Sequence, residues 1–253
     1  MGFSPLASVR PESPPQLETL AAAPLGFFMT VRDVAFWIRS WRADSHINRA
    51  RRQHGAASAF DSLYAGSKDP FGAELPQYRY QQRKYNSLLS MLPRRRYQNV
   101  LDIGCGLGAF TRKIAPFSEA VLGTDISEVA ITQARELSSD HPNVTYSVQA
   151  AMESPGEHAA FDLIVLADTL YYTESLTVER IESISSHVAS KLMPGGLLLL
   201  VNHYFFGVDS ASRATRAAHD VFRGGPLLDC VAEHRRAFFL ATILQRADLQ
   251  QAA

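Results

Sequence analysis

The chain has 253 residues, of which 46% are hydrophobic and 20% charged, and its 25 basic side chains balance 25 acidic ones. This profile excludes collagen-like, coiled-coil and wholly disordered proteins, and the chain is long enough for one full hydrophobic core. Two cysteines, Cys105 and Cys230, are too few for a disulfide framework or a cysteine metal cluster, which favours a cytoplasmic protein.

No membrane-spanning segment is predicted, because the longest aliphatic run, 197–201, is far shorter than the roughly 20 residues a span needs. The charges are nevertheless unevenly distributed. Residues 1–98 hold 14 Lys and Arg against 7 Asp and Glu, whereas residues 99–253 hold 11 against 18. The basic part either binds an anionic partner or docks on the acidic part of the same chain. The lack of any nucleic-acid-binding motif favours docking and predicts no nucleic-acid partner.

Residues 1–25 are rich in proline and show no sustained period, so they are predicted to form a flexible leader. Residues 26–98 are predicted to form a helical segment. Within it, the apolar positions of 31–41 recur at helical spacing with arginines between them. This amphipathic helix could lie on a membrane surface, cap a pocket or pack on the core, and packing is favoured. Residues 60–72 predict turns, and 78–93 predict a helix that ends before Pro93.

From residue 99 to 253 short aliphatic runs alternate with amphipathic helices, which is typical of an α/β fold with a doubly wound sheet. Strands are predicted at 99–103, 119–125, 143–148, 161–167 and 196–203, and the tail predicts two further antiparallel strands. Helices are predicted at 107–115, 127–138 and about 175–192. The expected domain is therefore one seven-stranded sheet that ends in an antiparallel hairpin.

The most informative segment runs from Val100 to Phe110, where a strand leads into a glycine loop and then a helix. Glycines let a ligand touch the backbone, and the helix N-terminus offers free N–H groups. Asp125 follows Gly106 by nineteen residues at the end of the second strand, where a carboxylate accepts both hydroxyls of a ribose. An adenosine-containing cofactor is implied.

The loop also satisfies the dinucleotide fingerprint, so NAD is an alternative cofactor. Asp102 argues against it, because a carboxylate there would repel a pyrophosphate but would bind a cationic amino acid group. About a hundred residues also precede the loop, and Met193 to Gly196 turns from a long helix into the fifth strand.

Four motifs together resemble the class I S-adenosylmethionine-dependent methyltransferases: residues 99–110, 125–127, 161–165 and 192–196. The resemblance covers about residues 60–246. More narrowly, 69–72 with Tyr78 and Arg83, 167–172 and 233–235 resemble the nodulation N-methyltransferase (NodS-like) group, which methylates an amine of an amino-sugar oligomer. The resemblance implies a Rossmann-like fold with an N-terminal helical lid, and S-adenosylmethionine as cofactor, with S-adenosylhomocysteine as product.

The resemblance also assigns the cofactor residues. Gly104, Gly106 and Gly108 would lie against the methionyl and ribose parts, Asp102 would face the amino group, and Asp125 would bind the ribose. The remaining expected contacts come from the following residues: Ile126, Met152, Asp168, Tyr64 and Arg83. This chain departs from the family pattern at Ala151, where an acidic residue usually meets the adenine amine. Glu153 is a candidate substitute.

Methyl transfer from a sulfonium requires in-line positioning, exclusion of water and a group that takes the acceptor's proton. The candidates leave the fourth and fifth strands at their carboxyl ends, where such sheets bind ligands. Asp168, His203 and Tyr171 are predicted to be catalytic, and one of Tyr171 and Tyr172 is expected in the pocket and the other in packing. By resemblance, Tyr64, Tyr78 and Arg83 belong to a lid.

The insertion at 205–226 is expected to shape the acceptor pocket, with Arg213 and Arg216 either facing anionic groups or solvent. His234 is expected in the terminal hairpin, and Cys105 as a small loop residue.

The favoured function is methylation of an amine of a small molecule. An O-methyltransferase, an NAD-dependent oxidoreductase and a non-catalytic cofactor-binding interaction protein stay open as alternatives, as does a homodimer as the assembly. No metal ligands are predicted.

Overall fold

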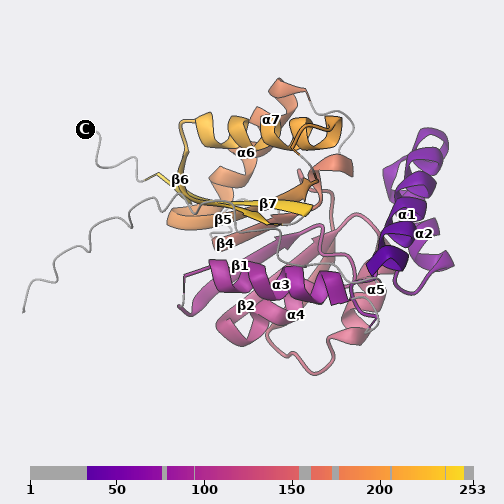
Figure 1. Cartoon of the computed structure of the whole chain (residues 1–253). Helices are drawn as coiled ribbons and strands as arrows, with labels where there is room; N and C mark the ends of the chain where they lie inside the picture. The colour runs from indigo at the N-terminus through magenta and orange to yellow at the C-terminus, as the bar shows by residue number, and fades with distance from the viewer. Residues whose placement is uncertain are drawn as a thin grey trace, which may run out of the picture.

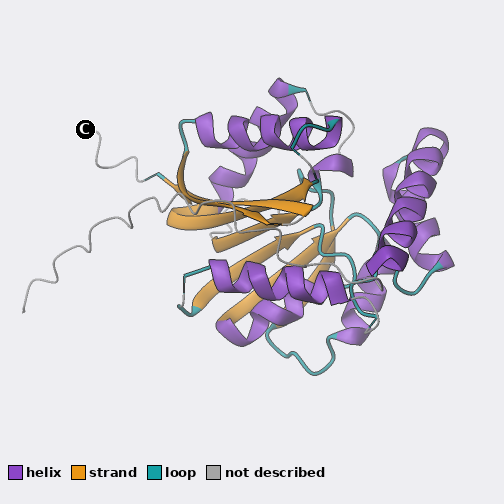
Figure 2. Ribbon diagram, viewed as in Figure 1, coloured by secondary structure: helices purple, strands orange, loops and turns teal. Residues whose placement is uncertain are grey.

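The computed structural model describes residues 33–75, 79–93, 95–153, 161–172, 177–205, 207–236 and 238–247, with the side chains of 33–35 excepted. Its centre is one seven-stranded sheet in the order β3-β2-β1-β4-β5-β7-β6, with helices on both faces (Figures 1 and 2). The predicted α/β fold with an antiparallel terminal hairpin is confirmed. The predicted leader 1–25 and Tyr78 lie outside the described residues.

The five parallel strands lie close to their predicted positions. They are β1 (Tyr97–Ile103), β2 (Ser118–Asp125), β3 (Val144–Val148), β4 (Phe161–Ala167) and β5 (Leu192–Tyr204). The hairpin strands β6 (Leu228–Arg236) and β7 (Phe238–Arg246) pair antiparallel, and β7 pairs antiparallel with β5. Because the first five strands are parallel, their carboxyl ends meet at one edge of the sheet.

Both faces of the sheet are covered, which explains why β4 is a continuous apolar run. On one face, Leu163 and Val165 pack with residues of α3 (Arg79–Met91) and α4 (Ala109–Ile114). On the other face, Ile164 and Leu166 pack with residues of α6 (Val178–Lys191) and α7 (Ser210–Gly224). A 3-10 turn (Ala115–Phe117) follows α4, and α5 (Glu128–Leu137) begins at the predicted Ser127 N-cap, whose hydroxyl accepts the N–H of Ala130.

The N-terminal helices α1 (Asp33–His54) and α2 (Ala56–Gly66) lie to one side of the sheet, as Figure 1 shows at its right edge. They meet the carboxyl ends of the strands. The Tyr172 hydroxyl, after β4, donates to Asp44 of α1 at 2.7 Å, and the Ser127 hydroxyl, after β2, donates to Asp61 of α2 at 2.7 Å. The helical segment thus forms a cover over the sheet edge that the sequence predicts as the binding edge.

Two predicted boundaries are wrong. Residues 60–66 are helical, because Phe60, Leu63 and Tyr64 repeat at helical spacing and bury one face, and the turns begin only after α2. The expected helix at 175–192 ends at Lys191, and β5 starts at Leu192 rather than Gly196, since Leu192 already pairs with Phe161 across an irregular register. Residues 173–176 lie outside the described part of the chain.

Asp162 ties β4 to the start of β1. Its side chain, 8% exposed, accepts the N–H groups of Gln98 at 2.9 Å and Asn99 at 3.0 Å. These donors cannot pair within the sheet ladder at that point, so the carboxylate satisfies them.

We expect Asp162→Ala to lower the free energy of unfolding by about 1–3 kcal/mol, because two backbone N–H groups lose the carboxylate that accepts them. Urea denaturation measures the change. Asp229→Ala, at an exposed position of β6, is the matched control and should shift stability by less than about 0.5 kcal/mol. Equal effects of the two substitutions would contradict the assignment.

Candidate functional site

A cavity of about 340 Å³ opens at the carboxyl ends of the parallel strands, beneath α1 and α2. Its volume lies within the range of ligand-binding pockets. The loops that follow β1, β2, β3 and β4 line it, together with residues of the N-terminal helices. The predicted site residues that line it are Tyr64, Asp102, Gly104, Gly106, Asp125, Ile126, Met152, Asp168 and His203.

The glycine loop wraps the base of the cavity. Gly104, Gly106 and Gly108 all have positive φ, of 72°, 54° and 76°, which L side chains rarely adopt. A Cβ at Gly106 would lie 2.8 Å from the Tyr64 hydroxyl. Gly108 lies at the N-cap of α4, where it shapes the turn, and does not line the cavity; its place against the cofactor stays a prediction.

Asp125 ends β2 and points at the glycine loop. Its carboxylate accepts the N–H of Gly106 at 2.9 Å and that of Ser127 at 3.0 Å. Burial raises the pKa of Asp125, and these backbone donors offset part of that rise. The side chain is therefore held rigidly in the cavity wall, where a vicinal diol can reach its oxygens.

Asp102 ends β1 on the opposite side of the loop. It is 3% exposed and accepts the Thr111 hydroxyl at 2.6 Å. Burial raises its pKa to about 6, although the Thr111 hydroxyl opposes the rise. This buried carboxylate has no cation beside it among the described residues, so a cationic group in the cavity would complete it.

The far end of the cavity is lined by Ile126 and by residues 149–152, which follow β3. No carboxylate faces this end at Ala151, as the sequence indicates. The candidate substitute Glu153 accepts the N–H of Ala150 at 3.0 Å and does not line the cavity. Gln149 does, and its Oε1 atom is buried without a hydrogen-bond partner. Gln149 is therefore the polar side chain at this end.

Asp168 follows β4 in a left-handed conformation, with φ 55°. Its N–H donates to the Val201 carbonyl of β5 at 2.8 Å, which holds this unusual backbone in place. One carboxylate oxygen, Oδ2, pairs with the fully buried ammonium of Lys84 on α3. The other, Oδ1, lies 3.7 Å from Nε2 of His203 and is buried without a hydrogen-bond partner. It is positioned to accept a proton donor from a ligand.

The charges around Asp168 fix its protonation. Burial alone would raise the pKa of Asp168, but the Lys84 ammonium and His203 outweigh it and hold that pKa below its usual range. Burial lowers the pKa of His203, and Asp168 opposes this only in part. Near neutral pH the cavity thus presents an ionised carboxylate beside a neutral imidazole.

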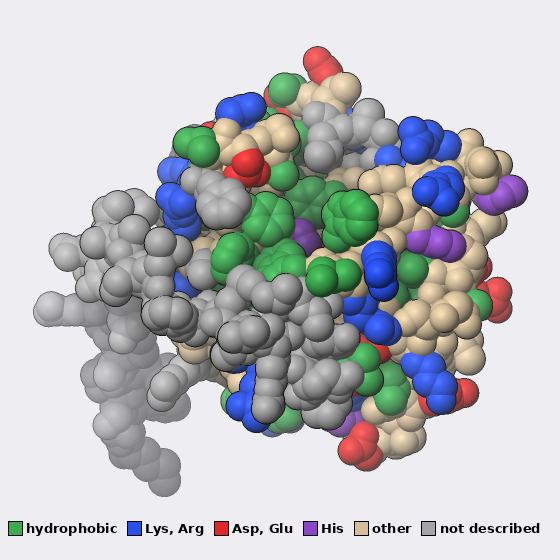
Figure 3. Space-filling view, turned by 45° about the vertical axis from the view of Figure 1, so that its right-hand side comes forward, with side chains coloured by type: hydrophobic (Ala, Val, Ile, Leu, Met, Phe, Trp, Pro, Cys, Tyr) green, Lys and Arg blue, Asp and Glu red, His purple; other side chains and the backbone are tan. Residues whose placement is uncertain are grey.

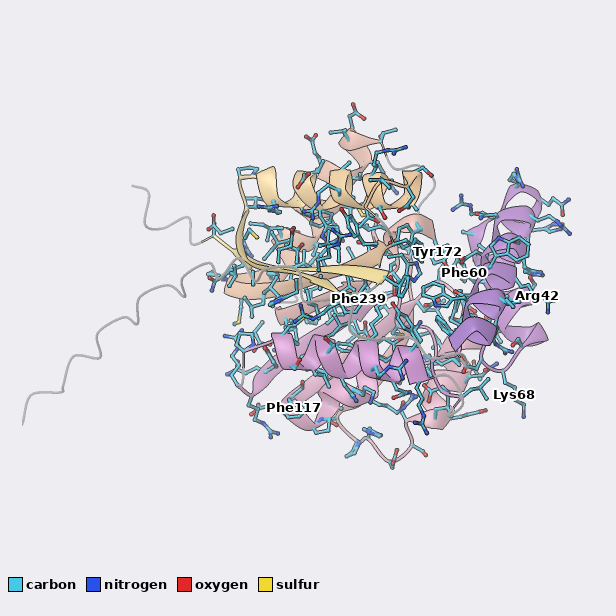
Figure 4. The ribbon with its side chains drawn as sticks, viewed as in Figure 1. Arg42, Phe60, Lys68, Phe117, Tyr172 and Phe239 are labelled. Carbon is cyan, nitrogen blue, oxygen red and sulfur yellow. The ribbon has the colours of Figure 1, made fainter. Side chains whose placement is uncertain are left out.

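His203 is held in an aromatic stack. Its ring lies parallel to that of Tyr171, with centroids 5.5 Å apart, and Phe205 stacks on it at 5.8 Å. The predicted catalytic residue Tyr171 does not line the cavity, because its hydroxyl donates to the His203 carbonyl at 3.2 Å. Tyr172 lines it instead and meets Phe60 edge-on, with ring centroids 5.1 Å apart. Figure 4 labels both residues beside the N-terminal helices. Tyr172 therefore lies in the pocket and Tyr171 in packing, whereas Tyr171 was the tyrosine predicted to be catalytic.

Two charged residues of the site escaped the sequence analysis. Lys84 falls on the buried face of α3 with Tyr80 and Leu88, so a lysine at an apolar helical position was the available signal. Nothing in the sequence around Asp44 distinguishes it from an ordinary residue on the surface of a helix. Burial raises its pKa, and the Tyr172 hydroxyl, which donates to it, opposes the rise.

Other residues that the sequence singled out do not line the cavity. Arg83 does not line the cavity, although its neighbours Gln81 and Tyr85 on α3 do. The segment 205–226 forms α7 over the sheet, and none of its described residues lines the cavity. Its contact with the site is indirect, because Thr215 donates to the His203 carbonyl at 2.8 Å.

The remaining charged and nucleophilic residues that the sequence singled out lie outside the chemistry of the site. Arg216 pairs with Glu233 at 2.8 Å rather than meeting an anionic ligand, and the Arg213 side chain donates to the carbonyl of Val208. His234 lies in β6, within the hairpin, as predicted. Burial raises the pKa of Cys105, which makes that thiol a poor nucleophile. Among the described residues, no cluster of three or more potential ligands could hold a metal ion.

Comparison with known families assigns the centre of the chain. Residues 100–196 match the family described as a methyltransferase domain. Nodulation protein S of Sinorhizobium fredii is 29% identical over 60% of this chain and 66% of its own length, and that of Rhizobium tropici is 29% identical over 54% of each. A malonyl-[acyl-carrier protein] O-methyltransferase of Enterobacter lignolyticus is 32% identical over 51% of this chain and 49% of its own. The matches thus span two thirds or less of these relatives.

Solved structures share the fold. The N-methyltransferase NodS of Bradyrhizobium japonicum WM9, in complex with S-adenosyl-L-homocysteine, superposes with a TM-score of 0.65 at 21% identity and covers 76% of this chain and 98% of that one. A protein of Pyrococcus horikoshii superposes with a TM-score of 0.60 at 19% identity, over 73% of this chain and 98% of that one. Together with the family match, these comparisons confirm the resemblance to class I S-adenosylmethionine-dependent methyltransferases of the NodS-like group.

We expect the stability cost of Asp102 to depend on pH. Its folded pKa of about 6 exceeds its unfolded value, so the carboxyl carries no ionisation penalty below about pH 4 and disfavours folding by up to about 3 kcal/mol above pH 6. Asp102→Asn should therefore unfold like the parent protein at pH 4 but be more stable at pH 8. Thermal and urea unfolding at both pH values measure this, and equal stability differences at the two would contradict a raised pKa.

Proposed function

We propose that this chain, whose residues 100–196 match the methyltransferase-domain family, is a class I S-adenosylmethionine-dependent enzyme that moves a methyl group to an amine of a small molecule. The observation that carries the proposal is Asp168. An ionised carboxylate oxygen, buried and without a hydrogen-bond partner, lies beside a neutral histidine in the cavity wall. This pair suits an acceptor that brings an N–H group.

The cavity fits the cofactor. Asp125 would accept the ribose hydroxyls, and Asp102, which has no cation beside it, would hold the amino group of the methionyl part. The positive φ of Gly104 and Gly106 leaves the loop backbone open to close approach. Gln149 and Met152 would flank the adenine ring in place of the missing acidic residue. When bound, the cofactor supplies a methyl group already activated on a sulfonium.

The acceptor chemistry follows from proton transfer. An amine must arrive with a free lone pair, and after its nitrogen gains the methyl group it must release one proton. Asp168 Oδ1 would accept an N–H of the acceptor and orient the lone pair. His203, neutral because its pKa is lowered, is the group that can take the released proton.

An amine suits this site better than an alcohol. An imidazole whose pKa lies below its usual value is far too weak a base to ionise an alkyl hydroxyl before transfer, whereas an alkylammonium, with a pKa of about 10, is a much stronger acid than an alkyl hydroxyl. Phe60, Tyr172 and Phe71 add aromatic faces to the cavity, which stabilise a developing ammonium through cation–π contact. Methylation of an acidic hydroxyl, such as that of a phenol, is the alternative that the acceptor screen distinguishes.

Titration calorimetry with S-adenosylmethionine, S-adenosylhomocysteine and NAD in parallel tests the cofactor. We expect micromolar binding of the first two and none of NAD. Methyl transfer is then followed on amino sugars and other amines, with phenols as the second acceptor class. Binding of NAD alone would overturn the proposal, and binding of the cofactor with transfer only to phenols would overturn its amine part.

We expect Asp125→Ala to weaken binding of S-adenosylhomocysteine by about 1–3 kcal/mol, since the ribose loses a charged acceptor. Calorimetry measures the affinity, and circular dichroism confirms folding because Asp125 also holds the loop. Asp220→Ala, at an exposed position of α7, is the control and should leave the affinity unchanged. An unchanged affinity in Asp125→Ala would remove the ribose assignment.

Substitutions at Lys84 and Asp168 should change kcat without changing the affinity for the cofactor. We expect Asp168→Asn to reduce kcat at least tenfold while S-adenosylhomocysteine affinity stays within twofold. In Lys84→Met the pKa of Asp168 should rise, because its paired cation is gone, so the acid limb of the kcat profile should move to higher pH. A lower kcat with an unmoved pH profile would reduce Lys84 to a structural role.

A further inference from the structure

The outward face of α1 carries a stripe of exposed side chains, here called the outer stripe. Its members are Ile38, Trp41, Arg42, Ser45, Arg49 and Arg52. At 100° per residue these six positions fall within an arc of roughly 100°, so they share one side of the helix. From Ile38 to Arg52 the stripe spans fifteen residues, so its ends lie about 21 Å apart at 1.5 Å per residue.

The charge of the outer stripe is entirely basic and uncompensated. Arg42, Arg49 and Arg52 form no ion pair with any described residue, and the only acceptor that Arg52 meets is the Asn48 carbonyl of its own helix. The nearby acidic side chains point away from it. Asp44 accepts from Tyr172, and Asp61 accepts from Ser127, both on the side facing the sheet.

The other end of the outer stripe is apolar. Trp41 is 69% exposed and Ile38 is 49% exposed, which is unusual for such large side chains. They lie one turn apart and next to Arg42. A tryptophan, an aliphatic side chain and a row of arginines on one helix face are the components of a helix that lies in a membrane interface.

We propose that the outer stripe binds the surface of an anionic phospholipid bilayer. Figure 1 shows α1 at the outer edge of the molecule, so its exposed side is open to an external surface. Figure 3 shows several Lys, Arg and His side chains exposed on the right half of the view. A nucleic acid would satisfy the arginines but leave Ile38 in water, whereas the headgroup region of a bilayer accepts both kinds of side chain.

This proposal stands apart from the proposed methyl transfer, because it rests on surface residues that do not line the cavity. It has a geometric consequence for the site all the same. Ser40, on the inner side of α1, lines the cavity, and Asp44 holds the cavity residue Tyr172. A bilayer on the outer stripe would lie about one helix diameter, some 10 Å, from the cavity wall.

The experiment is flotation of the full chain with vesicles of phosphatidylcholine alone or with 30% phosphatidylglycerol. We expect partition only to the anionic vesicles, with a loss at 0.5 M salt. A surface arginine contributes about fivefold to partition, so Arg42→Gln/Arg49→Gln/Arg52→Gln should weaken it roughly 100-fold. Trp41→Ser should weaken it at both salt concentrations, since its contribution is apolar.

The matched control is Arg96→Gln/Arg213→Gln/Arg223→Gln, which removes the same charge from exposed positions elsewhere and should retain partition. Circular dichroism and S-adenosylhomocysteine affinity show whether each variant is folded. Equal partition to neutral and anionic vesicles, or equal losses in the two triple variants, would overturn the proposal. Tighter binding to a single-stranded oligonucleotide, measured by fluorescence anisotropy and unaffected by Trp41→Ser, would also overturn it.

Discussion

The buried ion pair between Lys84 and Asp168 is the interaction on which the site depends. It joins α3, which belongs to the N-terminal segment, to the loop that leaves β4. An ammonium with no exposed surface is tolerable only because a carboxylate faces it, and that carboxylate keeps its own charge only because the ammonium is there. Loss of either partner would leave an uncompensated charge beside His203. This ion pair therefore couples the stability of the helical segment to that of the sheet.

The cavity contains buried carboxylates that lower the stability of the protein, and a ligand that pairs with them offsets this cost. Asp102 and Asp125 lie at the ends of neighbouring strands, and burial raises the pKa of both carboxyls. Thr111 and the backbone N–H groups of Gly106 and Ser127 offset only part of that cost. What is missing for Asp102 is a cation, and what is missing for Asp168 is a hydrogen-bond donor. A ligand that brings both would be bound in part by relieving these two penalties.

The sequence predicted well what depends on local pattern. Strand and helix periods located the sheet, and the glycine loop with Asp125 located the binding edge, because both signals lie within contiguous segments. It failed where tertiary packing decides. Tyr171 and Tyr172 are adjacent and identical, and only the approach of α1 and α7 determines which one faces the cavity. Asp44 is an ordinary helix-surface residue by spacing, and only the fold brings it to the site.

Many of the basic residues in the N-terminal part of the chain lie on α1, and they fall on two different sides of that helix. Arg39 donates to the Asp69 carbonyl at 2.7 Å and Arg51 to the Tyr172 carbonyl at 3.1 Å, so these two arginines dock the helix on its own protein. Docking on residues 99–253, the interpretation that the sequence favoured, is consistent with the Arg51 contact, whereas Arg39 binds within residues 1–98. It does not account for Arg42, Arg49 and Arg52, which point outward from the same helix without a carboxylate partner in the described chain. Because these arginines face solvent on one side of the helix, they are available to charge outside the molecule: α1 contacts the rest of the protein with one side and carries the proposed bilayer-binding stripe on the other.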